Sequence, residues 1–216
     1  MVTYPDISDA VSNLPEGTSS ATDGDTSTYR TLIDLGFICM RESDLTAILV
    51  YRVFRAYRKL SLKILHAVLH ILAFLFAAVG IKAAFQMHND LGIPNMYSLH
   101  SWLGIAALVL FGVQWLAGLI AFLVPPVPQP ARAAYLPIHV SFGGMLYLLI
   151  IGVCIAGITE KNFFSNKYPL SQPRELLGNA LGICLVVFGG LVFYLTSQPA
   201  YRRVEAVSPE RRALNE

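Results

Sequence analysis

The chain has 216 residues, of which 55% are hydrophobic and only 14% are charged, and its formal net charge is +2. A soluble domain of this length needs far more charged surface than that. The composition therefore indicates a membrane protein. A net charge this small gives no support to nucleic-acid binding.

The N-terminal part of the chain is polar. Residues 1–30 carry acidic side chains among Ser, Thr and Gly, without the basic start and apolar core of a secretory signal. Between Leu32 and Tyr51 an apolar end is mixed with charges such as Asp34 and Glu42, which make a spanning helix costly. We therefore expect residues 1–45 to be disordered or interfacial, on the cytoplasmic side.

Four apolar runs follow, each long enough to cross a hydrocarbon core about 30 Å thick as a helix. They are Leu62 to Phe85, Tyr97 to Val124, Ala134 to Ile158, and Leu176 to Ser197. The segments that connect these runs contain glycine and proline, which end helices, so consecutive helices are expected to form antiparallel hairpins. The pattern predicts an all-α integral membrane bundle of about four transmembrane helices over residues 46–200.

Basic residues gather before the first run and after the last one. Those before the first run are Arg52, Arg55, Arg58, Lys59 and Lys63. Residues 201–216 form a basic tail. Because cytoplasmic loops carry an excess of Lys and Arg, both termini are expected to be cytoplasmic. The loop from Gln86 to Met96 then faces the lumen or the exterior.

Four of the five histidines lie within or at the edge of an apolar run. The five are His66, His70, His88, His100 and His139. A titratable side chain in hydrocarbon costs free energy unless it is paired or ligated, so the clustering calls for a specific explanation. For any single one of them, an interhelical hydrogen bond explains the position as well as a functional site does.

His66 and His139 open the first and third runs, so the topology puts them at one depth. Two axial ligands of a haem iron come from opposite faces and hence from two helices, which this pair satisfies. Lys59 precedes His66 by seven residues, about 10 Å of helical rise. Arg132 precedes His139 by the same interval. With Lys63, these cations predict a collar for haem propionates or an anionic reductant, although simple anchoring at the membrane surface also explains their presence.

The other histidines have different explanations. His66 and His70 form an H-x-x-x-H pair able to bind zinc, but the run offers no carboxylate or cysteine to complete such a site. His70 is expected to form an interhelical hydrogen bond or to pack around the macrocycle. His88 lies in the loop at the opposite surface, and His100 opens the second run there, so His100 is expected to ligate a different haem.

Six short segments carry a resemblance to a known family. They are Leu49-Val50-Tyr51-Arg52, Lys63-Ile64-Leu65-His66, Asn95-Met96-Tyr97-Ser98-Leu99-His100-Ser101-Trp102, Gln114-Trp115, Pro137-Ile138-His139, and Gly157-Ile158-Thr159-Glu160-Lys161. With these, the chain resembles the cytochrome b561 family of ascorbate-dependent transmembrane electron carriers from about Ala47 to Tyr201. The resemblance implies six helices that hold two haem b groups, one near each surface.

The resemblance also implies roles for particular residues. His66 and His139 would ligate the iron of the cytosolic-side haem, and His100 would supply one ligand of the luminal-side haem. Positions for cytosolic ascorbate are matched by Arg52, Lys59, Lys63 and Arg132. His88 matches a luminal histidine near the acceptor site, where monodehydroascorbate or ferric iron would be reduced. The membrane would be that of a vesicle, a lysosome or endosome, or the plasma membrane, and a homodimer is one assembly it allows.

The chain departs from the family before the first run. The family's first helix and most of its second are expected to be absent, and with them the His-Pro motif whose histidine completes the luminal haem site. That histidine would fall near Leu32, but no histidine precedes His66. Water, Met40 or a partner chain would have to replace it, so we expect one complete haem site here.

Two hypotheses remain from the sequence. The first is a transmembrane oxidoreductase that keeps one complete haem site. The second is a truncated, catalytically impaired isoform that acts as a partner or regulator of full-length chains. A truncated isoform or a mispredicted first exon explains the departure better than an evolved four-helix carrier. A metal-ion transporter is disfavoured because the apolar runs lack carboxylates.

Overall fold

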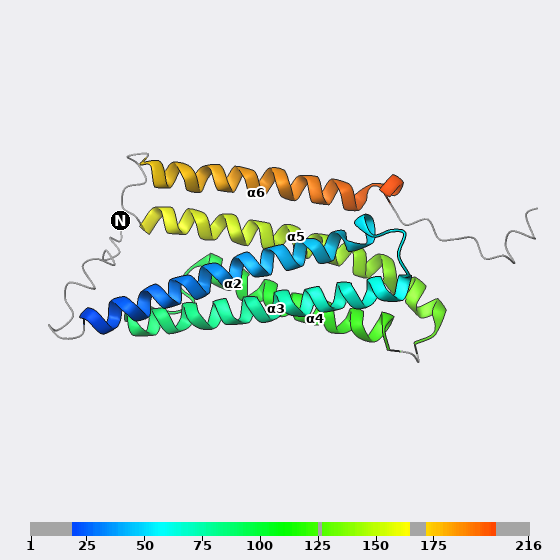
Figure 1. Cartoon of the computed structure of the whole chain (residues 1–216), viewed down its shortest axis with the longest axis horizontal. Coiled ribbons are helices and arrows are strands. Elements are labelled where there is room, and N and C mark those ends of the chain that lie inside the picture. The colour runs from blue at the N-terminus through cyan, green and yellow to red at the C-terminus, as the bar shows by residue number, and fades with distance from the viewer. Residues whose placement is uncertain (1–18, 125–126, 165–171, 202–216) are drawn as a thin grey trace, which may run out of the picture.

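The computed structural model describes residues 19–124, 127–164 and 172–201, and all regular structure in these ranges is helical. The helices are α2 (Ser19–Val53), α3 (Lys59–Asp90), α4 (Leu99–Phe122), α5 (Gln129–Phe164), α6 (Pro173–Ser197) and the short 3₁₀ helix η2 (Pro199–Tyr201). Figure 1 shows the long helices running side by side as an elongated bundle. The predicted all-α fold is confirmed.

Among the described residues, four helices, α3 to α6, are long and apolar enough to cross a membrane. Each contains most or all of one predicted run, so the expectation of four transmembrane helices is confirmed. The 36 residues of α5 extend about 54 Å, more than the hydrocarbon core of about 30 Å, so this helix tilts or projects beyond the bilayer. Large apolar side chains face outward, as Leu177 does with 71% of its surface exposed, which suits contact with lipid.

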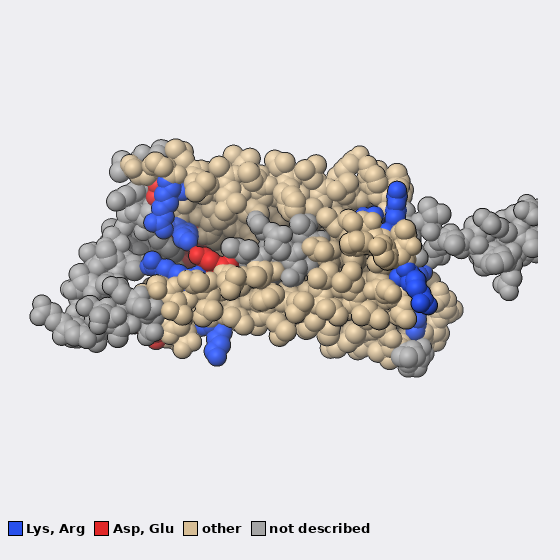
Figure 2. All heavy atoms as spheres, viewed as in Figure 1, with Lys and Arg blue, Asp and Glu red and all other residues tan. Residues whose placement is uncertain are grey.

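Charged side chains are distributed as a membrane protein requires. Figure 2 shows Lys and Arg side chains gathered toward the two ends of the bundle on this face, with a broad band of other residues between them. Cations at the ends keep their charge in water while the band between them meets hydrocarbon. The arrangement supports an orientation in which the helices cross the bilayer along the long axis of Figure 1.

The helix α2 differs from what the sequence led us to expect. It has 35 residues and runs antiparallel along α3 (Figure 1). A Cβ atom on Gly36 would lie 2.9 Å from the carbonyl oxygen of Phe76 and 3.1 Å from Cα of Gly80, so the two backbones nearly touch. Ala47 and Val50 are fully buried. Small residues therefore allow α2 to pack closely against α3, although the N-terminal part of α2 is polar.

The expectation that residues 1–45 are disordered or interfacial stays a prediction. Within this range, residues 19–45 form most of α2. Residues 1–18 and the tail 202–216 lie outside the described residues. The described ends of the chain, Ser19 and Tyr201, lie at opposite ends of the bundle (Figure 1). These ends therefore give no support to the expectation of two cytoplasmic termini, and the termini themselves lie outside the described residues.

Candidate haem sites

The helices α3 and α5 bring His66 and His139 together. Their ring centroids lie 6.4 Å apart, with 71° between the ring planes. An imidazole nitrogen binds a metal ion at about 2 Å, so two imidazoles on opposite sides of one ion have ring centres on the order of 6 Å apart. The separation of this pair therefore fits bis-histidine ligation of a haem iron.

Hydrogen bonding at the two rings also fits metal binding. Nδ1 of His66 lies 2.8 Å from the carbonyl oxygen of Ala47 on α2. When Nδ1 donates its proton to a carbonyl, Nε2 keeps the lone pair that binds a metal. Nδ1 of His139 is buried and has no hydrogen-bond partner among the described residues. A buried ring nitrogen without a protein partner is unusual and marks a position suited to a bound group.

His70 lies one turn along α3 from His66, with ring centroids 4.4 Å apart. Its other face meets the ring of Phe111 on α4 at 5.3 Å. His70 therefore packs between a candidate ligand and a neighbouring helix. Within residues 19–124, 127–164 and 172–201, no group of three or more His, Cys, Asp or Glu side chains is arranged to hold a metal ion, so the zinc alternative gains no support.

Two adjacent side chains of α4 hold the helices that carry these histidines. Nε2 of Gln114 donates to the carbonyl oxygen of His139 at 2.7 Å. Nε1 of Trp115 donates to the carbonyl oxygen of Ala67 at 2.9 Å. Because Ala67 is next to His66 in the chain, α4 fixes α3 and α5 at the depth of the candidate ligands.

Three of the basic residues matched to ascorbate binding lie at this end of the bundle and bind main-chain carbonyl groups, namely Arg52, Lys63 and Arg132. Arg52 donates to the carbonyl oxygen of Gln198 at 3.0 Å and to that of Thr196, at the end of α6. Nζ of Lys63 donates to the carbonyl oxygen of Phe122, the last residue of α4, at 3.2 Å. Carbonyl groups at a helix C-terminus lack helical partners and carry partial negative charge, so these cations stabilise α4 and α6.

Arg132 completes the same arrangement from α5. Its Nε and Nη2 atoms donate to the carbonyl oxygens of Val127 at 2.9 Å and Val124 at 3.0 Å. Arg132 and Lys59 both repel the charge of Lys63 electrostatically. The structure therefore gathers these cations, as the sequence predicts, and also gives Arg132 a structural task in the connection between α4 and α5.

Two aromatic residues cover His139, and the sequence analysis did not identify them. The ring of Phe122 lies 5.3 Å from His139, and that of Tyr135 lies 6.0 Å from it. Phe122 and Tyr135 stack on each other at 5.7 Å, and Nζ of Lys63 lies 6.0 Å from the centre of the Phe122 ring. The signal for Tyr135 was available, because a residue four positions before a helical histidine lies on the same face.

His100 lies at the other end of the bundle from His66 and His139. Its Nδ1 is 2.9 Å from the carbonyl oxygen of Val153 on α5, which again leaves Nε2 for a metal. His100 and Tyr97 line a surface hollow of ≈ 460 Å³. The ring of His88 lies 6.2 Å from that of Tyr97. The five histidines therefore divide into two groups at opposite ends of the bundle, as the sequence predicts.

The helix α2 contains no histidine that could supply the second ligand of a haem held by His100. Leu32, where the resemblance would place one, lies on α2 with 37% of its surface exposed. The side chain of Met40, the alternative within the chain, lies outside the described residues. The helix is present at this end of the bundle, but the histidine is not.

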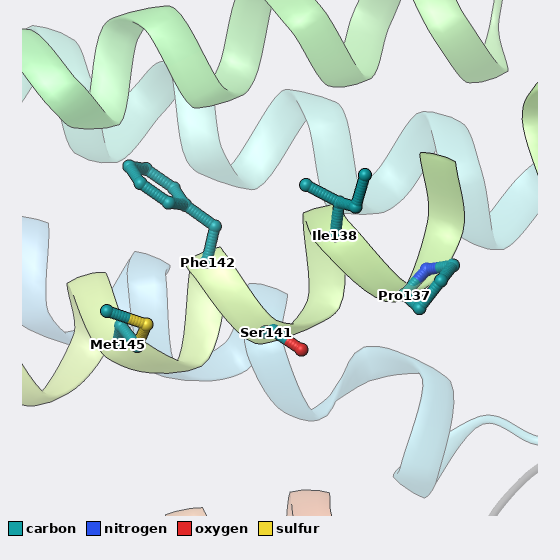
Figure 3. Close-up of a pocket in the computed structure, with 5 residues that line it drawn as sticks. All are labelled: Pro137, Ile138, Ser141, Phe142 and Met145. Atoms are coloured by element: carbon teal, nitrogen blue, oxygen red, sulfur yellow. The ribbon is translucent and has the colours of Figure 1, made fainter. Parts of the chain in front are cut away.

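A second hollow of ≈ 400 Å³ lies on α5 beside the His139 region. Figure 3 shows the five residues that line it, namely Pro137, Ile138, Ser141, Phe142 and Met145. It is mostly apolar, and Met145 exposes 67% of its surface. Such a hollow on the outer face of a spanning helix suits a lipid chain rather than a charged substrate.

A membrane-spanning helical bundle with histidines grouped at two depths has the architecture of a transmembrane b-type cytochrome. Residues 30–165 match the family described as eukaryotic cytochrome b561. The chain belongs to this family, which implies a b-type haem as its cofactor.

Individual relatives are similar over most of this chain. The transmembrane ascorbate-dependent reductase CYB561 of Sus scrofa is 43% identical over 171 residues, which cover 78% of this chain and 67% of the relative. The protein of the same name in Homo sapiens is 42% identical, over 73% of this chain and 63% of the relative. The plasma membrane ascorbate-dependent reductase CYBRD1 of Xenopus tropicalis is 39% identical, over 85% and 65%. The matches thus span about two thirds of the length of these relatives.

The family match corrects one expectation from the sequence. From the sequence, the resemblance begins at about Ala47, but the match begins at residue 30, within α2, and α2 packs along α3. The resemblance therefore covers most of α2 as well. Charged residues in this helix obscured its small and apolar positions, such as Gly36, which approaches the backbone of α3, and the buried Ala47.

Proposed function

We propose that this chain is a transmembrane oxidoreductase that takes single electrons from ascorbate on the cytosolic side and passes them to an acceptor on the other side. The observation that carries the proposal is the pairing of His66 and His139 at 6.4 Å, with Nδ1 of His66 engaged by Ala47. A haem bound between the two imidazoles supplies a reversible one-electron store. The relatives' names, which describe ascorbate-dependent reductases, support the choice of donor.

The chain's own residues have distinct tasks in this proposal. His66 and His139 would hold the haem, which would supply one-electron rather than oxygen chemistry. Lys59, Lys63 and Arg132 raise the local concentration of the ascorbate anion. Arg52, at the same end of the bundle, adds a fourth positive charge there.

The acceptor side lies at the opposite end of the bundle, with His88 and His100. Monodehydroascorbate and ferric iron are the acceptors we propose, and His88, whose ring lies 6.2 Å from that of Tyr97, would contact them. His100 would hold one face of a second haem. We propose a vesicle, lysosomal or endosomal, or plasma membrane as the location, with the collar facing the cytosol, and a homodimer as the assembly.

One observation favours a second candidate function. No histidine precedes His66, so the His100 site lacks the ligand that the family's pattern gives it. A chain with one complete site would transfer electrons poorly across the whole membrane. It would instead act as a partner or regulator of family members that carry both haem sites.

The test is the reduced-minus-oxidised absorbance spectrum of the purified protein, with the ratio of haem to protein. About one haem per chain, reduced by ascorbate and lost in His139→Ala, supports the proposed cytosolic-side site. The control is His88→Ala, a histidine at the other end of the bundle, which should keep the haem content of the wild type. A wild-type protein without haem would rule out electron transfer and leave the regulatory alternative.

A further inference from the structure

The helices α4 and α5 are related by a reciprocal contact. A Cβ atom on Gly118 of α4 would lie 2.8 Å from Cε1 of His139 on α5. A Cβ atom on Gly157 of α5 would lie 2.7 Å from Cε1 of His100 on α4. The interval from His100 to Gly118 equals that from His139 to Gly157. Each helix thus carries one candidate ligand, and a glycine that receives the ligand of the other.

The contact at Gly118 leaves no room for a side chain. Carbon atoms pack best at about 3.5–4.0 Å, so a methyl group at this position and the imidazole of His139 exclude each other. The ring has little freedom to retreat, because Phe122 lies 5.3 Å and Tyr135 6.0 Å from it. A side chain at position 118 would therefore displace the ring from its place opposite His66.

The helix α4 also holds the main chain of His139. Gln114, one turn before Gly118, donates its amide hydrogen to the carbonyl oxygen of His139 at 2.7 Å. The helix α4 therefore fixes both the backbone and the ring of a residue that α5 carries.

We propose that Gly118 is a positioning residue for His139 as a haem ligand, and that Gly157 has the same role for His100. The inference rests on the proposed function, because the contact between Gly118 and His139 affects haem binding only when His139 is a haem ligand. Outer contacts of a metal ligand set its orientation, and their loss lowers metal affinity. Gly118 acts by leaving space where any other residue would place a side chain.

Glycines in membrane helices also allow close packing without any role in a site. Gly104 on the same helix separates the two explanations. A Cβ atom there would lie 3.7 Å from Cγ1 of Val153, which is an ordinary contact. Gly104→Ala therefore adds a methyl group to the same pair of helices, away from His139, and serves as the matched control.

The experiment compares haem binding by the full chain in wild type, Gly118→Ala and Gly104→Ala. Haem affinity by titration, the midpoint potential and the low-spin ferric electron paramagnetic resonance signal are measured. Gly118→Ala should bind haem on the order of tenfold more weakly, with an altered resonance signal from the reoriented imidazole. Gly104→Ala should match the wild type in all three. Wild-type affinity, potential and resonance in Gly118→Ala would overturn the inference alone.

A double variant covers the case in which Gly118→Ala does not fold. If the methyl group clashes with the imidazole, Gly118→Ala combined with His139→Ala should fold as well as His139→Ala by size-exclusion chromatography and circular dichroism. If the double variant stays misfolded while His139→Ala folds, the glycine serves packing in general and the inference is overturned. A lack of haem in both wild type and Gly104→Ala would overturn the proposed function, and this inference with it.

Discussion

Lys63 has two roles that an experiment can separate. Its Nζ atom caps α4 through the carbonyl oxygen of Phe122, and its charge contributes to the collar proposed for ascorbate. A glutamine at this position keeps an N–H donor, on a side chain one atom shorter, and removes the charge. The pair of roles explains why a cation within a spanning helix is tolerated, because its ammonium group reaches the end of α4 rather than hydrocarbon.

Lys63→Gln should raise KM for ascorbate roughly fivefold at low ionic strength, the equivalent of about 1 kcal/mol for one lost charge interaction. The difference from the wild type should shrink as salt is added, because salt screens the collar. Steady-state ascorbate oxidation in membrane vesicles at two salt concentrations measures both effects. Lys82→Gln, at an exposed position toward the other end of α3, is the control and should keep the wild-type KM. An unchanged KM in Lys63→Gln would assign this residue to helix capping alone.

The helices α2 and α3 cross at Gly36 and Gly80, and the space for an added side chain differs between these two glycines. A Cβ atom on Gly36 would lie 2.9 Å from the carbonyl oxygen of Phe76, which belongs to the rigid backbone. A Cβ atom on Gly80 would find Cα of Gly36 at 3.8 Å, an ordinary contact. The two positions are therefore a matched pair that adds the same methyl group to the same crossing.

Gly36→Ala should lower the free energy of unfolding by about 1–3 kcal/mol, because the added methyl group forces the two backbones apart. Gly80→Ala should have little effect. Thermal unfolding in detergent, followed by circular dichroism, compares the two variants. Because Ala47 of α2 binds the ring of His66, Gly36→Ala should also weaken haem binding. Equal stability of the two variants would show that α2 is held elsewhere.

The direction of α2 has a consequence for the membrane topology of the whole chain. The loop between α2 and α3 contains Tyr57 and lies with the collar, whereas Asn95 lies in the loop between α3 and α4 at the other end. Thr28, near the start of α2, lies toward the end that carries Asn95. If the collar faces the cytosol, the start of α2 faces the opposite side.

Cysteine labelling from one side of the membrane tests this arrangement. The background is a chain in which the native cysteines are replaced by serine: Cys39, Cys154 and Cys184. An impermeant maleimide added to the cytosolic side should react with Tyr57→Cys and not with Asn95→Cys or Thr28→Cys. Labelling of Thr28→Cys together with Tyr57→Cys would place the start of α2 on the cytosolic side, as the charge pattern alone suggested, and would contradict the packing of α2 along α3.

Local features of the sequence sufficed to predict the four spanning helices and the division of the histidines between two ends. Both follow from local properties. Hydropathy over about 20 residues identifies a spanning helix, and the alternating direction of successive helices gives the depth of each histidine in the membrane. The pairing of His66 with His139 could be predicted for this reason, as could the gathering of cations near them.

The packing of the helices determines where α2 lies, which carbonyl groups Arg52 and Lys63 cap, and which glycine faces His139. Each of these is a contact between residues distant in the chain, such as Gly36 with Gly80 or Gly118 with His139. Hydropathy and residue spacing do not indicate which helix surfaces contact one another. Backbone approach at a glycine, or a ring against a facing helix, is fixed only when the helices pack against one another.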